Sequence, residues 1–424
     1  ENSRGGSGAA KLIAANATNA WTLAAAGFDI DGLIFSGIET LQGGAGADTF
    51  TISTNFNNAI NGGAGNDQFI VSANASDLNG EAGNDTLEVS DSTLAVDFDG
   101  GANNDTVNYT GAAAVNWILS GDDAGNLGNL TFTTTEVIIG GTGADTLTAE
   151  NATNVWTLAA TGFDIDGLIF SGIETLQGGA GSDMFMISMN TTIPGSAINV
   201  INAGAGNDRF IVSANAGELN GESGDDTLEV SDGSFITDFD GGADSDTVNY
   251  TGSSSISWFL SDNNDGNFGR ISFSAIEVIN GGSGTETLTV ENAPNVWTLS
   301  DAGFDIDGLA FSNIESLIGG TSIDTFIIST EFNTAINAGA GDDIFIVSAD
   351  AGNLNGQAGN DTLEISNSNL TVDFDGGINT DTINYTGNAN VNWSLTGDNE
   401  GDLGGLRFSA IDVINSGSGA DTLI

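Results

Sequence analysis

Short stretches of strictly alternating apolar and polar residues follow glycine-rich turns throughout the chain. The second and fourth residues after the aspartate of each turn are apolar, as in Phe50 and Ile52, Phe69 and Val71, Leu87 and Val89, and Val107 and Tyr109. Another apolar residue lies two places before each glycine pair. A period of two is typical of a β-strand with one buried face. The pattern therefore predicts two rows of short strands joined by tight turns.

Each turn places several glycines around one aspartate, as in GGAGADTFTIS from Gly43 and GGAGNDQFIVS from Gly62. Glycine adopts left-handed backbone angles that a Cβ atom penalises, so these glycines predict a tight chain reversal. Successive turn aspartates from Asp48 to Asp105 are 19, 18 and 20 residues apart. This spacing predicts coils of about 19 residues that stack into a solenoid.

A longer repeat encloses the short one. The segment NATNAWTLAAAGFDIDG from Asn16 returns in nearly the same form from Asn151 and Asn292. We place the long repeats at 5–139, 140–280 and 281–415, with the start of a fourth at 416–424. The second repeat carries an insert near 189–200, around Ile193-Pro194-Gly195, which we expect to form a loop extruded from one coil.

Intervals of about 40 residues, such as Asp105 to Asp145, are interpreted as two coils, one of which lacks the full glycine turn. The chain is then predicted to be all-β, one continuous parallel β-solenoid over 1–424 with about 22 coils and uncapped ends. Because exposed strand edges template further pairing, we expect self-association end to end, with lateral association as a second mode.

Composition adds a large negative charge to this picture. Among 424 residues there are 58 acids, 5 lysines or arginines, no histidine and no cysteine, and the formal net charge is −53. Nothing basic is present to neutralise phosphate, which excludes nucleic acid and anionic lipid as partners. No apolar run approaches the roughly 18 residues of a membrane span, so we expect no membrane insertion. Without cysteine there is no disulfide scaffold and no thiol catalysis.

The turn aspartates are the candidate chemistry. In stacked coils they would lie about 5 Å apart along one edge, where like charges repel by ~1 kcal/mol per pair even in water. Carboxylates and glycine carbonyls are hard oxygen ligands of flexible geometry, which suits Ca²⁺ better than Mg²⁺. The alternative is ordinary Asx turns whose acids are only solvated. We predict one calcium column along the glycine-turn edge, with these ligands: Asp48, Asp67, Asp85, Asp105, Asp145, Asp183, Asp208, Asp226, Asp246, Asp324, Asp343, Asp361, Asp381 and Asp421.

These turns resemble the RTX (hemolysin-type calcium-binding) nonapeptide GGxGxDxUx. Four turns match all of GGxGxD, beginning at Gly43, Gly62, Gly140 and Gly178, and others differ at one or two positions. The resemblance implies a parallel β-roll with Ca²⁺ between stacked turns and secretion by bacteria. RTX rolls usually carry the nonapeptide at both edges of a coil. Here only one edge carries it, so we expect a single column.

Three further features of the sequence allow more than one interpretation. The tryptophans either fill wider coils or present a platform for sugar stacking or filament contact: Trp21, Trp117, Trp156, Trp258, Trp297 and Trp393. Alternation does not decide whether the following glutamates point inward: Glu39, Glu136, Glu174, Glu277 and Glu315. The recurring FDIDG lacks the third acid and the closing glutamate of an EF-hand loop, so we interpret it as a variant solenoid turn.

The sequence favours an extracellular structural protein, a Ca²⁺-stiffened fibre, sheath or biofilm-matrix filament at a bacterial surface. The alternative is the stalk or spacer of a large RTX adhesin that binds surface glycans. A third hypothesis, the calcium-dependent export segment of a secreted enzyme, fits the long near-identical repeats poorly. We expect no catalysis, since every acid recurs with the repeat and an active site is normally a singular constellation.

Overall fold

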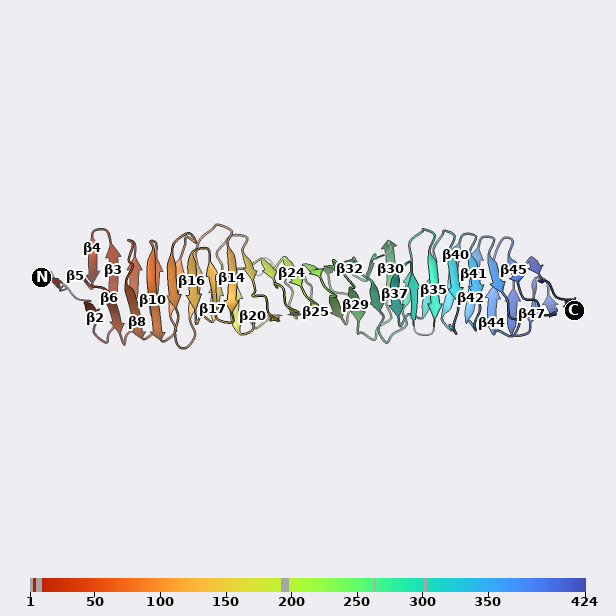
Figure 1. The fold of residues 1–424 in the computed structure, drawn as a ribbon, viewed down its shortest axis with the longest axis horizontal. Helices are drawn as coiled ribbons and strands as arrows, with labels where there is room; N and C mark the ends of the chain where they lie inside the picture. The colour runs from red at the N-terminus through yellow and green to blue at the C-terminus, as the bar shows by residue number, and fades with distance from the viewer. Residues whose placement is uncertain (1–2, 5–9, 192–197, 263, 301–302) are drawn as a thin grey trace. The chain divides into compact units, whose positions relative to one another are not determined.

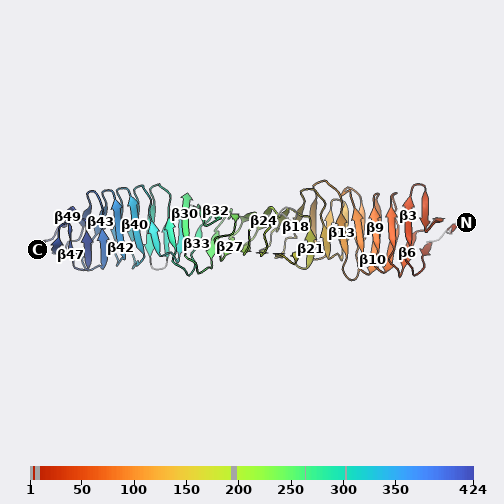
Figure 2. The same cartoon turned by 180° about the vertical axis from the view of Figure 1, so that it is seen from behind.

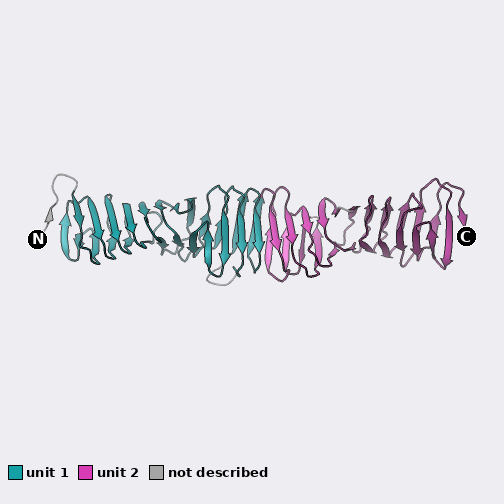
Figure 3. Ribbon diagram, turned by 90° about the horizontal axis from the view of Figure 1, so that it is seen from below, with its two compact units in different colours: residues 1–222 teal, residues 223–424 magenta. Residues whose placement is uncertain are grey.

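The computed structural model describes residues 3–4, 10–191, 198–262, 264–300 and 303–424. The loop predicted around Ile193-Pro194-Gly195 lies outside these ranges. The described residues form strands and turns without any helix, so no helix among them could cross a membrane. The chain divides into two compact units, 1–222 and 223–424 (Figure 3), each of which is described by itself.

Unit 1 is built from two sheets of parallel strands between which the chain alternates (Figure 1). Sheet A contains β7 (Thr49–Ile52), β9 (Gln68–Val71), β11 (Thr86–Val89) and β13 (Thr106–Tyr109), paired in this order. Sheet B contains β6 (Thr40–Gly44), β8 (Ala59–Ala64), β10 (Ala75–Ala82) and β12 (Val96–Asp99), also paired in order. The predicted all-β parallel solenoid is confirmed.

The predicted apolar columns form the core of unit 1. On sheet A, Phe50 pairs with Phe69 and Phe69 with Leu87, and all three side chains are fully buried. The rings of Phe50 and Phe69 stack with their centroids 5.1 Å apart. Phe69 also meets Phe98 of sheet B edge to face at 5.8 Å, so the two sheets share one core. A single coil could not bury these side chains, but stacked neighbours do.

The long intervals are not pairs of plain coils, and our interpretation of them was wrong. After β13 the chain forms an antiparallel meander on sheet B: β14 (Asn116–Gly121), β15 (Ala124–Leu127) and β16 (Leu130–Thr133). The third strand, β16, pairs with β12, and the first, β14, pairs with β18 (Thr146–Thr148). The chain thus skips two strand positions on sheet B, doubles back to fill them with β15 and β16, and then continues beyond β14.

The same device occurs on sheet A. One meander comprises β19 (Val155–Ala159), β20 (Gly162–Ile165) and β21 (Leu168–Ser171), placed between β17 (Val137–Ile139) and β23 (Met184–Ile187). An earlier one comprises β3 (Ala20–Ala24), β4 (Gly27–Ile30) and β5 (Leu33–Ser36). Figure 2 shows β3, β9 and β13 following one another along sheet A. The remaining strands of unit 1 are β1 (Ser3–Arg4), β2 (Lys11–Ile13), β22 (Thr175–Gln177), β24 (Val200–Ala205), β25 (Arg209–Val212) and β26 (Glu218–Ser223), which ends at the division.

The meanders explain FDIDG and the tryptophans. FDIDG is the second strand of a meander and its hairpin turn, where Asp31 and Gly32 have φ angles of 50° and 85°, so the variant solenoid turn was wrong. Each tryptophan lies on the first meander strand and is at most 2% exposed. Trp21, for example, stacks on Phe50 at 5.3 Å. The tryptophans therefore fill the core and cannot stack on a sugar.

Unit 2 repeats this architecture. Its sheet A contains β27 (Thr227–Val230), β29 (Thr247–Tyr250), β33 (Val278–Asn280), β39 (Thr325–Ile328), β41 (Ile344–Val347), β43 (Thr362–Ile365), β45 (Thr382–Tyr385) and β49 (Val413–Asn415). Its sheet B contains β28 (Thr237–Asp240), β34 (Thr287–Thr289), β38 (Ser316–Ile318), β40 (Ala335–Ala340), β42 (Asn353–Ala358), β44 (Val372–Asp375) and β50 (Thr422–Leu423).

Three meanders interrupt these sheets of unit 2. They comprise β30 (Ser257–Asp262), β31 (Asp265–Phe268) and β32 (Ile271–Ser274); β35 (Val296–Ser300), β36 (Gly303–Ile306) and β37 (Leu309–Ser312); and β46 (Asn392–Gly397), β47 (Glu400–Leu403) and β48 (Leu406–Ser409).

Candidate metal centre

The first aspartates of the predicted set form a buried column at the turns that lead from sheet B to sheet A. Asp48, Asp67, Asp85 and Asp105 are at most 2% exposed. The Oδ1 atom of each later aspartate accepts a hydrogen bond of 2.7 Å from the backbone N–H of the aspartate one coil earlier. The carboxylates are thus part of the stacking itself, and they are not a solvated outer edge.

Both ends of this column were missed from the sequence. Asn19 begins it, since its backbone N–H and its side-chain Nδ2 each donate to Asp48 Oδ1 at 2.6 Å. Glu136 ends it, accepting from the N–H of Asp105 at 2.6 Å. Like the aspartates, both residues immediately precede the first residue of a sheet A strand. That shared frame, rather than the glycine turn, was the signal that could have identified them.

The other B-to-A turns repeat the arrangement. In unit 1, Asn154 donates to Asp183 at 2.6 Å and Asp183 to Asp208 at 2.6 Å. In unit 2 the bonds join Asp226 to Asp246, Asp246 to Glu277, Asn295 to Asp324, Asp324 to Asp343, Asp343 to Asp361, Asp361 to Asp381 and Asp381 to Asp412. The glutamates that alternation left undecided therefore turn a carboxylate oxygen to the backbone of the neighbouring coil.

Many aspartates of the column keep a second carboxylate oxygen that has no hydrogen-bond partner among the described residues. This applies to Oδ2 of Asp48, Asp67, Asp85, Asp105, Asp183, Asp246, Asp343, Asp361 and Asp381. A Cβ atom on Gly80 would lie 2.3 Å from Asp85 Oδ2 and 2.2 Å from the carbonyl oxygen of Gly100 in the next coil. The carboxylate and the carbonyl oxygen thus approach the same glycine, which must lack a side chain.

The glycines of one turn serve different purposes. The glycines at the second and fourth positions of the turn are left-handed, as predicted: Gly63 has a φ of 115° and Gly65 a φ of 135°. The first glycine, Gly62, lies outside that region, and a Cβ there would be 2.3 Å from Asp67 Oδ2. Our prediction of left-handed glycines was therefore wrong for the first position, where space next to the carboxylate is the requirement.

Burial shifts the pKa of the column upward. Loss of solvent raises the pKa of Asp85 and Asp183 to about 7, although each accepts a backbone hydrogen bond that acts in the opposite direction. The same cause raises the pKa of Asp67 to about 6, and the charges of Asp48 and Glu81 add to it. At neutral pH the ionised column is therefore unfavourable without protons or a cation beside it.

Asp145 and Asp421 do not belong to this column, so the predicted single column was wrong for them. Both lie at turns that lead from sheet A to sheet B. Between Asp105 and Asp145 the chain makes three passes, along β13 in sheet A, the meander in sheet B and β17 in sheet A. Because the number of passes is odd, the glycine turn of Asp145 lies at the other edge. Asp421 accepts from the N–H of Val391 at 3.0 Å.

The A-to-B turns differ among themselves in how they bond their carboxylates. Asp145 Oδ1 accepts from Val115 N–H at 2.9 Å and Oδ2 from Gly141 N–H at 3.0 Å. The N–H of Asp145 in turn donates to Glu174 Oε2 at 2.7 Å. In unit 2, Glu286 takes the equivalent place and its N–H donates to Glu315 Oε2 at 2.7 Å. Glu286 is fully buried, and neither of its own carboxylate oxygens has a well-aligned hydrogen bond.

The donor set of the B-to-A column fits Ca²⁺ in its chemistry. No three acids converge in the described ranges, so carboxylates alone would not complete a site. Several coils do supply one free carboxylate oxygen beside a backbone carbonyl oxygen, as at Asp48 and Gly62 and at Asp85 and Gly100. Oxygen ligands of these two kinds are those that Ca²⁺ prefers. Asp145 fits less well, because both of its oxygens already accept hydrogen bonds.

Comparison with known proteins agrees with this chemistry. The family described as RTX calcium-binding nonapeptide repeat (4 copies) matches residues 34–51, 52–87, 131–155, 170–185, 195–228 and 329–363. No curated protein matches the chain. The matched segments lie in both units, and they contain turns from both the column and the opposite edge. These segments, well under half of the chain, carry RTX calcium-binding nonapeptide repeats, and repeats of this kind form β-rolls.

Proposed function

We propose that this protein is an extracellular structural protein of a bacterial surface, a β-solenoid that Ca²⁺ stiffens for use in a fibre, sheath or biofilm-matrix filament. The observation that carries the proposal is the buried aspartate column, in which Asp48, Asp67, Asp85 and Asp105 each keep one carboxylate oxygen without a hydrogen-bond partner among the described residues. A buried carboxylate in every turn is unfavourable for folding alone, and it becomes favourable when a cation binds between turns.

The proposed calcium ligands are the column aspartates and the carbonyl oxygens beside them. These aspartates are Asp48, Asp67, Asp85, Asp105, Asp183, Asp208, Asp226, Asp246, Asp324, Asp343, Asp361 and Asp381. Bound calcium would supply positive charge that offsets their mutual repulsion. The chain itself holds the carboxylates in place through Oδ1, as in the 2.7 Å bond from Asp67 N–H to Asp85.

Asp85 illustrates how much stability a buried, ionised carboxylate costs. Asp85 has its pKa raised from 3.8 to about 7. Ionising such a carboxyl in the folded state removes about 4 kcal/mol of stability. Three such carboxylates would together remove about 12 kcal/mol, which is the whole stability of an ordinary domain. Extracellular calcium modules bind at roughly 0.1–1 mM, a level available outside cells, which supports an extracellular location.

A second proposal treats the solenoid as the stalk or spacer of a large adhesin that contacts surface glycans. In either case we propose that chains self-associate, and that the repeated acids are structural and not catalytic, because each recurs in several coils.

Calcium titration of the whole chain tests the proposal. We expect circular dichroism in millimolar Ca²⁺ at pH 8 to show strand structure with a high melting temperature, and EDTA to lower that temperature strongly. Isothermal titration should give several calcium ions per chain. An identical melting temperature in EDTA and in Ca²⁺ would contradict calcium stiffening.

Self-association needs its own measurement. We expect light scattering and negative-stain electron microscopy to show assembly that depends on Ca²⁺. A monomeric chain at all calcium concentrations would contradict the filament and leave the stalk as the better proposal.

A further inference from the structure

Three B-to-A turns carry an asparagine where the other turns of the column carry an aspartate. They are AANATN at 14–19, AENATN at 149–154 and VENAPN at 290–295, and each lies directly ahead of a sheet A meander. None of them contains a glycine, and none of their residues, all of which the structure describes, has a positive φ. The asparagine therefore occurs together with a turn that does not need the left-handed glycines of the aspartate turns.

The side-chain amide of Asn154 lies among four oxygen atoms. Its Nδ2 donates to Asp183 Oδ1 and to the carbonyl oxygen of Ala152, both at 2.8 Å. The carbonyl oxygens of Glu150 and Gly178 lie 3.3 and 3.4 Å from the same nitrogen. Asn154 and Asp183 are at most 3% exposed. Hydrogen bonds within the chain therefore satisfy this amide nitrogen without water.

The other two asparagines repeat this contact. In the first repeat, Asn19 Nδ2 donates at 2.6–3.3 Å to the equivalent four oxygens, which belong to Ala15, Ala17, Gly43 and Asp48. In the third repeat, Asn295 Nδ2 donates to the carbonyl oxygen of Ala293 at 2.7 Å and to Asp324 Oδ1 at 3.1 Å. The amide thus bridges its own turn and the carboxylate of the next coil in all three repeats.

An aspartate at the same place in the column turns an acceptor toward the same kind of oxygen. Asp48 Oδ2 has no hydrogen-bond partner among the described residues. A Cβ atom on Gly43 would lie 2.4 Å from this oxygen and 2.3 Å from the carbonyl oxygen of Gly62, so the two acceptors approach each other. Two acceptors without a donor need a proton or a cation between them. Such a contact between stacked aspartates is called an aspartate gap below.

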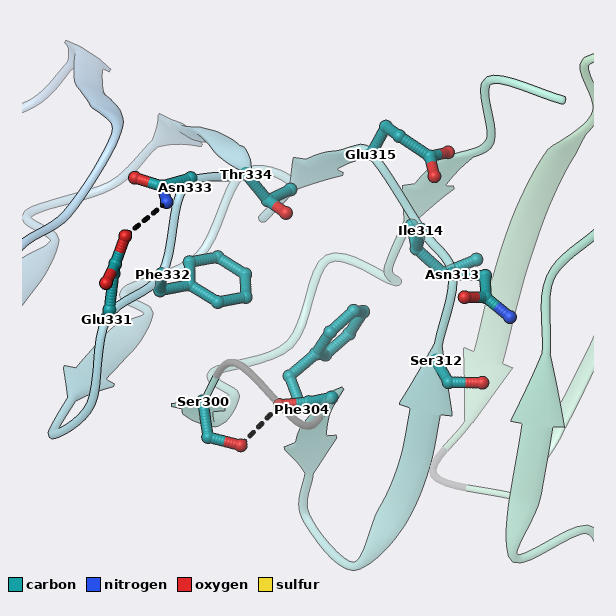
Figure 4. A pocket seen from close by; sticks show the side chains of 11 residues that line it. Ser300, Phe304, Ser312, Asn313, Ile314, Glu315, Glu331, Phe332, Asn333 and Thr334 are labelled. Atoms are coloured by element: carbon teal, nitrogen blue, oxygen red, sulfur yellow. Dashed lines mark hydrogen bonds between the residues drawn. The ribbon is translucent and has the colours of Figure 1, made fainter. Parts of the chain in front are cut away.

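Aromatic packing joins the same coils. The tryptophan two residues after each asparagine stacks on the phenylalanine two residues after the partner aspartate, at 5.3 Å for Trp21 and Phe50, 5.5 Å for Trp156 and Phe185, and 5.2 Å for Trp297 and Phe326. In unit 2 the second meander strand adds Phe304, whose ring meets that of Phe332 edge to face at 6.4 Å (Figure 4). This packing needs no ion, because the contacts are apolar.

We propose that Asn19, Asn154 and Asn295 form calcium-independent joints at the start of each aspartate column. Their amides supply the donors that the aspartate gaps lack, so the joints close without a cation. They fasten β3 to β7, β19 to β23 and β35 to β39. The inference rests on the proposed calcium stiffening of the remaining gaps. In a calcium-poor medium the chain loosens at the aspartate gaps and keeps the three joints.

Hydrogen exchange of the whole chain at pH 8 tests the joints. Met184 N–H reports on a joint, since it donates to the carbonyl oxygen of Asn154 at 2.9 Å, and Thr86 N–H reports on an aspartate gap, since it donates to that of Asp67 at 2.8 Å. In EDTA we expect Met184 to be protected at least about tenfold more strongly than Thr86. In millimolar Ca²⁺ this difference should disappear.

The two proposals fail in different ways in this experiment. Equal protection of Met184 and Thr86 in EDTA would overturn the joints, even if calcium then protects both amides. Stronger protection of Met184 in EDTA, combined with a Thr86 amide that calcium leaves unchanged, would support the joints and contradict calcium stiffening.

A matched pair of variants separates the amide from the charge of the turn. Asn154→Asp places an acceptor where Nδ2 donates, so we expect the protection of Met184 in EDTA to fall about tenfold to hundredfold. Asn151→Asp adds the same charge to an exposed position of the same turn, and we expect less than about a threefold change. Protection that Asn154→Asp leaves unchanged, or that both variants lower equally, would overturn the proposal.

The reverse substitution guards against an Asn154→Asp variant that fails to fold. Asp85→Asn introduces an amide into an aspartate gap, next to the carbonyl oxygen of Gly100. The N–H of Thr106, which donates to the carbonyl oxygen of residue 85 at 2.8 Å, reports on this gap. We expect its protection in EDTA to rise at least about tenfold. Unchanged or lower protection would contradict the role proposed for the amide.

Discussion

Two glycine turns of unit 1 have almost the same sequence and hold their aspartates differently. GGAGND from Gly62 leaves Asp67 Oδ2 without a partner, whereas in GGTGAD from Gly140 both oxygens of Asp145 accept amide hydrogen bonds. The second glycine makes the difference: Gly63 is left-handed at 115°, while Gly141 lies outside that region and turns its N–H toward Asp145. The edge of the solenoid, and not the motif alone, decides what the carboxylate can bind.

The largest expected effect concerns the column as a whole. Because the folded-state pKa of Asp67 is about 6 and that of Asp85 about 7, both above 3.8, the folded protein binds protons more tightly than the unfolded chain. This contribution is fully present below about pH 3.8 and is lost as the pH rises through 6 to 7. In EDTA, we expect the melting temperature to rise by well over 10 °C between pH 8 and pH 5.

Millimolar Ca²⁺ should remove most of this pH dependence above pH 6, since the cation then takes the place of the protons. Circular dichroism melts at several pH values, with and without EDTA, measure both curves. A melting temperature in EDTA that stays constant or falls toward pH 5 would contradict the buried column.

A pair of substitutions separates the two edges. Asp85→Asn keeps an oxygen for the N–H of Asp67 and places an amide beside the Gly100 carbonyl, so without calcium at pH 8 we expect a gain of about 2–4 kcal/mol. Asp145→Asn removes the acceptor of Gly141 N–H, so we expect a loss of about 1–2 kcal/mol. Local hydrogen exchange in EDTA measures each change, and equal signs would show that the edges are alike.

Calcium should reverse the order for Asp85→Asn. The variant lacks one charged ligand, so its melting temperature in millimolar Ca²⁺ is expected to fall below that of the unchanged protein. If it stayed higher in calcium as well, Asp85 would not be a ligand.

Alternation was enough to predict the strands and the buried columns, because each apolar position after a turn, such as Phe50 or Phe69, has one possible face. The turn aspartates were likewise evident from their spacing. The meanders were not, since a hairpin strand and a solenoid strand alternate alike. Asp31-Gly32 and Asp166-Gly167, both between alternating apolar residues, are dipeptides typical of two-residue hairpins and could have revealed them.

The edge of each carboxylate could not be predicted without the meanders. Counting coils from Asp105 to Asp145 in steps of 19 or 20 residues assigns both to one edge, whereas the actual path makes an odd number of passes between them. The buried state of the aspartates was also beyond the sequence, because it depends on hydrogen bonds to the backbone of another coil.

Glu286 provides a smaller test within the A-to-B turns. Burial, and then the nearby carboxylate of Glu315, raise its pKa from 4.5 to about 7. Its contribution to stability is therefore complete below about pH 4.5 and is lost as the pH rises through 7. Glu286→Asp shortens the side chain to that of Asp145, and we expect about 1–2 kcal/mol of added stability at pH 8.

The check on Glu286→Asp is hydrogen exchange around β34 and β38 between pH 5 and pH 8. The variant should show a flatter pH profile there, and Glu286→Gln, which cannot ionise, should flatten it too. Unchanged profiles in both variants would mean that Glu286 does not titrate in this range.

The smallest expected effect lies at the end of the column. Glu136 is partly exposed, and its Oε2 accepts from the N–H of Asp105 at 2.6 Å. Glu136→Gln keeps an acceptor oxygen, so we expect a change of no more than about 0.5 kcal/mol, whereas Glu136→Ala leaves the amide unpaired and should lose about 1–2 kcal/mol. Hydrogen exchange at the Asp105 amide measures both. Water screens the charge of Glu136 but not that of Asp85. Removing the charge should therefore affect stability inside the column, whereas at its end only the loss of the acceptor oxygen should. Equal losses in the two Glu136 variants would show that the charge is required at the end as well.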